Sequence, residues 1–80
     1  MAYGDESTGL PRQSMYEIET TWQSPGDFGA LHYRRHVQVV VARYLEDAMD
    51  RAERHIDSCE PRYRRTPLVS RLLNQQGLPR

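Results

Sequence analysis

Residues 45–59 read LEDAMDRAERHIDSC, and this stretch decides the fold that the sequence predicts. Its apolar residues recur at spacings of four, three, four and three, which is the pattern of one stripe along an α-helix. Charged residues occupy the opposite side, with acids four residues before bases, and this order favours a helix. We therefore expect an amphipathic helix over about residues 44–59. Its apolar stripe consists of Leu45, Ala48, Met49, Ala52, Ile56 and Cys59.

Two stretches before this helix alternate apolar or aromatic residues with polar ones, which is the period of a half-buried strand. They span residues 15–23 and 30–41, and the loop between them, SPGDFG, is rich in glycine and proline. We predict an α+β fold in which this β-hairpin is covered by the helix. The alternative is an all-α chain with one long helix over residues 25–59, because Ser24 and Pro25 also suit a helix start. The hairpin would contribute to the core Tyr16, Ile18, Trp22, Leu31, Tyr33, Val37, Val39 and Val41.

The apolar side of each strand suggests the register of the hairpin. Pairing Trp22 with Tyr33 keeps both apolar sides together, and so does a slip of two residues, whereas a slip of one residue does not. We prefer the first register because the second sets Ile18 against Arg35. In both registers Arg35 interrupts the apolar side, so it either extends to the sheet edge or marks a site for an anionic ligand.

Residues 61–80 contain a basic linker followed by the signals of a short second helix. Thr66 and Pro67 suit its N-cap and first position, and Gly77 suits its end. We predict this helix at about residues 67–76 and expect it to dock on another protein. The chain then has three parts: a flexible N-terminal arm (1–14), a ββα core (15–60) and this basic docking segment (61–80). The predicted partner-binding patch is Leu68, Val69, Leu72 and Leu73.

Composition and charge limit the possible classes of protein. Eighty residues suffice for one small domain, and the formal net charge is zero. The charge is uneven, since residues 1–29 hold five acids against one arginine and residues 61–80 hold five arginines and no acid. We expect a cytoplasmic protein that does not enter a membrane, because the sequence has one cysteine, no long apolar run and no signal-peptide pattern. All eleven basic residues are arginine, which indicates a GC-rich bacterial or phage gene.

Histidine and cysteine residues are the candidates for a metal or catalytic site. His32 and His36 share one side of a strand, while His55 and Cys59 share one face of the helix, and we expect the two pairs on opposite sides of the sheet. Neither pair has the spacing of a zinc motif. Cys59 is expected to be a small buried residue, and no motif pairs a nucleophile with an oriented base. We therefore predict a non-enzymatic protein without metal or cofactor.

The predicted function is a small protein–protein interaction module, as in a phage accessory or virion protein. A lone hairpin leaves two open strand edges, so we expect self-association as a dimer or a larger oligomer. The alternative is a nucleic-acid-binding protein, in which arginines contact phosphates and a tyrosine stacks on a base. The residues for this alternative are Arg34, Arg35, Arg62, Tyr63, Arg64 and Arg65. The first two of them could instead hold a small anionic ligand.

Overall fold

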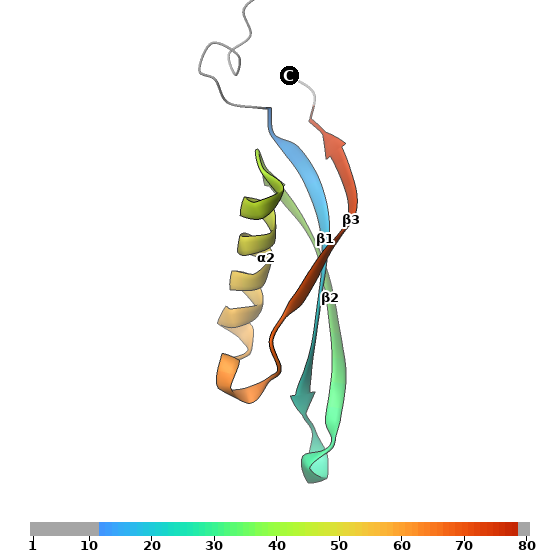
Figure 1. Cartoon of the computed structure of the whole chain (residues 1–80), viewed down its shortest axis with the longest axis vertical. Helices are drawn as coiled ribbons and strands as arrows, with labels where there is room; N and C mark the ends of the chain where they lie inside the picture. The colour runs from blue at the N-terminus through green and yellow to red at the C-terminus, as the bar shows by residue number, and fades with distance from the viewer. Residues whose placement is uncertain (1–11, 79–80) are drawn as a thin grey trace, which may run out of the picture.

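A three-stranded antiparallel sheet with one helix across one face forms the fold (Figure 1). The computed structural model describes residues 12–78. It confirms the predicted α+β class with a hairpin and a covering helix, and the all-α alternative is wrong. The strand order in the sheet is β2-β1-β3. The elements are β1 (Ser14–Pro25), η1 (Asp27–Gly29), β2 (Leu31–Ala42), α2 (Leu45–Cys59), η2 (Arg62–Arg64) and β3 (Val69–Gly77), where η marks a 3-10 turn.

The hairpin of β1 and β2 confirms the strand prediction to within two residues at each end. The turn is closed by a hydrogen bond from the Gly26 amide to the Ala30 carbonyl, at 2.6 Å. Phe28 and Gly29 both have positive φ, at 60° and 77°. A glycine tolerates this left-handed conformation without the steric cost of a Cβ atom. The loop therefore reverses the chain instead of beginning a helix.

The predicted C-terminal helix at 67–76 is wrong, because residues 69–77 form strand β3. This strand pairs antiparallel with β1 on the side away from β2. Thr66, the expected N-cap, begins this pairing instead: its hydroxyl accepts the Gln23 amide at 2.8 Å and its own amide donates to the Gln23 carbonyl at 2.9 Å. A helix of this length is marginal in water, whereas the free edge of β1 offers a row of hydrogen-bonding groups.

The observed register of the hairpin also differs from prediction, by one residue. Trp22 lies opposite Arg34, and Ile18 lies opposite Gln38. A one-residue shift turns every side chain of one strand to the other face. The predicted core side of β2 therefore points away from the helix, and the correction applies to Leu31, Tyr33, Val37, Val39 and Val41.

Small side chains explain why the even-numbered side of β2 faces the helix. Ala42 and the helix residues Ala48 and Ala52 are at most 2% exposed, and their short side chains let α2 approach the sheet closely. The polar Gln38 is accommodated because its amide donates to the Ala52 carbonyl at 2.9 Å. The core consists of Tyr16, Ile18, Ala42, Ala48 and Ala52, with Val40, Leu45, Met49 and Leu72 packed against it and Ile56 buried at the far end of the stripe.

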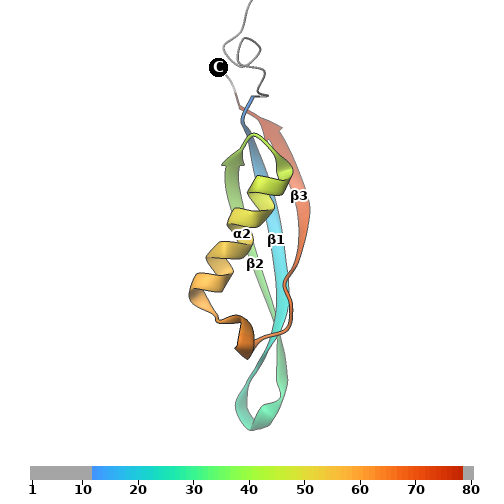
Figure 2. The same cartoon turned by 60° about the vertical axis from the view of Figure 1, so that its left-hand side comes forward.

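The helix follows its prediction apart from its last stripe residue. It begins at Leu45 and ends at Cys59, and Figure 2 shows it lying along the sheet. Cys59 is exposed, so its predicted burial is wrong. No helix in residues 12–78 has the length and apolar character needed to cross a bilayer. Most of the predicted N-terminal arm, residues 1–11, lies outside the described residues.

Candidate interaction surface

The sheet face opposite α2 is the candidate functional site, and we call it the open face. Within residues 12–78 no helix lies across it, as Figures 1 and 2 show. Side chains alternate between the two faces of a strand, and Tyr16 and Ile18 pack toward α2, so the odd-numbered residues of β1 and β2 lie on the open face. Its side chains include Met15, Glu17, Glu19, Thr21, Leu31, Tyr33, Arg35, Val37, Val39, Val41, Val69, Arg71, Asn74 and Gln76.

Strand β2 supplies most of the apolar surface of the open face. Tyr33 is 66% exposed, Val39 62% and Val41 39%, while Val37 is half-buried. We call these four residues the apolar row. In a half-covered antiparallel sheet the uncovered side of a strand is usually polar. The apolar row departs from this pattern, and an exposed apolar surface of this kind commonly marks an interaction site.

A carboxylate held between two guanidinium groups connects all three strands on the open face. Glu19 on β1 is ion-paired through Oε2 with the Nε atom of Arg35 on β2, and its Oε1 accepts from the Nε atom of Arg71 on β3 at 2.6 Å. The Glu19 side chain is 8% exposed, whereas Arg35 and Arg71 are 53% and 69% exposed. The sequence predicted Arg35 as an edge or anion-site residue, and its observed partner is Glu19.

The two arginines determine the charge state of Glu19. Hydrogen bonds from Arg71 and then from Arg35 lower the pKa of the Glu19 carboxyl below its ordinary value, and they outweigh the opposing effect of burial. The same hydrogen bond to Glu19 raises the pKa of Arg71. The cluster is therefore ionised at neutral pH, and it crosses the face from β2, where Arg35 lies between Tyr33 and Val37 of the apolar row.

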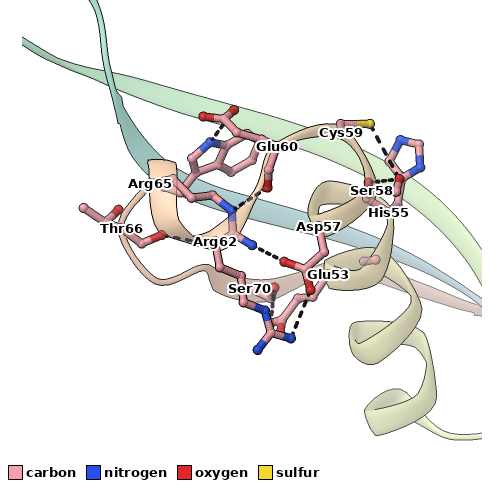
Figure 3. Close-up of polar contacts among 12 residues, drawn as sticks. Glu53, His55, Asp57, Ser58, Cys59, Glu60, Arg62, Arg65, Thr66 and Ser70 are labelled. Atoms are coloured by element: carbon pink, nitrogen blue, oxygen red, sulfur yellow. Dashed lines mark hydrogen bonds and ion pairs between the residues drawn. The ribbon is translucent and has the colours of Figure 1, made fainter.

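A second cluster of the same composition lies on the covered side, at the end of α2 (Figure 3). Asp57 is ion-paired with Arg65 through Oδ1 and accepts from Arg62 through Oδ2 at 3.2 Å. The Arg65 side chain is only 3% exposed and also donates to the Glu60 carbonyl at 3.1 Å. Arg65 thus fixes the connection from α2 to β3 and has little surface left for a ligand.

The residues predicted for nucleic-acid binding are therefore divided among three places. Arg35 lies on the open face, and Arg62 and Arg65 bind Asp57. Arg34 donates to the Ser24 hydroxyl at 3.1 Å, and Arg34 and Arg64 both line a cavity of about 290 Å³ beside Pro25. Tyr63 is 87% exposed. Nucleic-acid binding remains a prediction. Fewer of the predicted arginines could contact phosphates, because Arg35, Arg62 and Arg65 are paired with carboxylates of the same chain.

The predicted partner-binding patch is not one surface. The strand turns Leu72 toward the core, where it packs beside Ile18, while Val69 lies on the open face and is 64% exposed. Leu73 is 37% exposed and lies where the β1–β3 register shifts, and Leu68 lines a different cavity together with Arg62. A helical spacing would have joined these four residues, and the strand separates them.

The structure brings together two histidines that were expected on opposite sides of the sheet. His36 on β2 and His55 on α2 lie on the same side of the sheet, and their rings stack with centroids 5.4 Å apart. The Cys59 sulfur lies 3.8 Å from the Ser58 hydroxyl. In residues 12–78 no group of three or more histidine, cysteine or acidic side chains is placed to hold a metal ion.

The sequence did not predict the role of Glu19, because one of its two partners, Arg71, lies 52 residues away on a segment that was expected to be a helix. The sequence also did not predict the exposure of the apolar row, which follows from the shifted register. Comparison of the chain with protein-family models, curated proteins and solved structures finds no match. The function must therefore be argued from the site itself.

Proposed function

We propose that this chain is a non-enzymatic protein–protein interaction module that self-associates through the exposed side of β2. One observation carries the proposal: β2 turns its valine-rich side away from the helix, onto the open face. Leaving several β-branched and aromatic side chains in water forgoes a favourable burial of roughly 1.5–3 kcal/mol for each large side chain. Covering the apolar row with another protein surface would recover part of that free energy.

The charges of the open face support a protein partner. The Glu19 carboxylate offsets one of the two arginine charges within the same chain, so the cluster carries one net positive charge instead of two. Protein interfaces typically combine an apolar centre with a polar rim. On the open face Arg35 follows Tyr33 and precedes the valines of the apolar row, and the cluster extends from there across β1 to β3, so polar groups border the valines.

The experiment measures self-association by sedimentation velocity over a range of protein concentrations. We expect the wild-type chain to associate at micromolar concentration. Val39→Lys should weaken association at least about tenfold, because burying the charged lysine side chain in the interface costs free energy. Gln76→Lys is the matched control, since Gln76 is an exposed open-face residue on β3, two strands away from β2, and should tolerate the charge. A wild-type chain that stays monomeric and folded, or equal effects of both substitutions, contradicts the proposal.

A further inference from the structure

Strand β2 has one edge that pairs with no other strand of residues 12–78. It is the outer strand of the order β2-β1-β3, so within residues 12–78 it has a strand neighbour on one side only. Its twelve residues pair with β1 in one continuous register without a bulge. A long edge strand of this kind presents backbone amide and carbonyl groups that can pair with another chain.

The hydrogen bonds of Gln23 show which residues face that edge. Both its amide and its carbonyl bond to Thr66 on the β3 side. Along an antiparallel strand the direction of these groups alternates, so odd-numbered β1 residues face β3 and even-numbered ones face β2. The register pairs even-numbered residues of β1 with even-numbered residues of β2. The amides and carbonyls of the odd-numbered β2 residues, the apolar row and Arg35, therefore point to the free edge.

One contact from the helix agrees with this assignment. The Nη1 atom of Arg51 donates to the Val41 carbonyl at 2.9 Å, so the helix occupies one acceptor near the end of the strand. The span from Leu31 to Ala42 contains no proline, and its charged side chains are confined to Arg34 and Arg35. Residues 37–42 therefore contain neither proline nor a charged side chain, the residues with which natural edge strands avoid pairing. By contrast, β3 is the shorter outer strand and has a register irregularity opposite Glu17 and Ile18.

We infer that β2 pairs antiparallel with β2 of a second copy, so that two sheets join into one of six strands. The inference rests on the proposed function and specifies how the two copies meet. A second copy fits because the pattern of β2 is self-complementary about Val37. In that register Arg35 lies opposite Val39 of the second copy, and Tyr33 lies opposite Val41 of the second copy. Side chains directly opposite one another on paired strands are in contact, so the two apolar rows would lie side by side on one continuous face, each burying one flank of the other, and the two Arg35 side chains stay apart.

Two substitutions at one position separate edge pairing from packing of the open face. Val39→Pro removes an amide that points to the free edge, and proline is tolerated at such a position of an edge strand. Val39→Thr keeps the amide and replaces one methyl group of the open face by a hydroxyl. In the proposed register Val39→Pro deletes two hydrogen bonds between the copies, which should weaken the dimer at least about tenfold, whereas Val39→Thr should change it by only about threefold or less.

Amide exchange of the wild-type chain provides a second measurement in case the proline variant does not fold. The amides of Arg35, Val37 and Val39 should exchange more slowly as the protein concentration rises, and those of β3 should not change. Association that survives Val39→Pro in a folded chain but is lost in Val39→Thr overturns edge pairing and favours packing of the open faces. Concentration-independent exchange at β2 in an associating chain also overturns it. A monomeric wild-type chain overturns the proposed function together with this inference.

Discussion

The two faces of the sheet use the same strands in different ways. Toward α2 the sheet presents Tyr16 and Ile18 from β1, which pack on the small helix residues Ala48 and Ala52. On the open face β2 presents valines and a tyrosine that remain exposed. The more apolar side of β2 is thus not the side that forms the core. Close contact with an alanine-rich helix stripe decided which side was covered.

Each face also has a carboxylate between two arginines, and the two clusters differ in burial. At the end of α2, Arg65 is 3% exposed and Asp57 27%. On the open face Glu19 is buried, but Arg35 and Arg71 are each more than half exposed. An ion pair in contact with water contributes little to stability, whereas removing one partner of a buried pair is costly. The covered face should therefore be far more sensitive to substitution in the isolated chain.

The largest expected difference between the faces is in their apolar residues. Ile18→Ala should lower the free energy of unfolding by about 2–5 kcal/mol, because Ile18 is 0% exposed and its removal leaves a cavity. Val39→Ala removes exposed atoms and should change it by no more than about 0.5 kcal/mol. Urea denaturation at a concentration below that of association provides the measurement. Equal losses would show that the open face is part of the folding core of the single chain.

The sequence predicted those parts of the fold that depend on local periodicity. The stripe of residues 45–59 and the alternation in residues 15–23 and 30–41 placed α2, β1 and β2 to within two residues. Local patterns also identified the ion pair of Asp50 with Arg54, four residues apart on α2 at 2.9 Å. These features involve neighbours in the chain, so their physical causes are present in short segments.

The remaining features depend on contacts between distant segments, and the sequence alone did not predict them. Residues 69–77 became a strand because β1 had a free edge, although their spacing also suited a helix. The register of β2 followed from packing Ala42 against the helix, although the valines on its other side are more apolar. Glu19 binds Arg71, which is 52 residues away. The candidate site was missed because it depends on all three of these contacts.

A smaller effect should come from the arginines that share Asp57. Arg65→Ala should lower the free energy of unfolding by about 1.5–3 kcal/mol, because it removes a buried charged donor with several acceptors. Arg62→Ala removes an 83% exposed partner of the same carboxylate and should cost at most about 1 kcal/mol. Thermal or urea unfolding of both variants tests this order. A larger loss in Arg62→Ala would contradict the assignment of Arg65 as the structural member of the cluster.

The smallest effect is expected on the open face and depends on pH. The pKa of Glu19 in the folded chain lies below its ordinary value of 4.5, so its ionised form stabilises the fold. This contribution is fully present above the unfolded pKa and is lost as the pH falls through the lower folded pKa. The difference in unfolding free energy between wild type and Glu19→Gln should therefore be constant near neutral pH and shrink below about pH 4.5.

Arg71→Ala is the matched variant for this test because it keeps the carboxyl group and removes the hydrogen bond that lowers its pKa most. In that variant the folded pKa of Glu19 should move back toward its ordinary value. The acid-dependent part of the stability should then be smaller than in wild type, and its loss should be complete at a higher pH. Urea denaturation at a series of pH values, together with an NMR titration of the Glu19 side chain, measures both quantities. The loss should stay small because water screens the exposed arginines. If Arg71→Ala left the titration of Glu19 unchanged, Arg35 alone would hold the carboxylate. The cluster would then join two strands of the open face instead of all three.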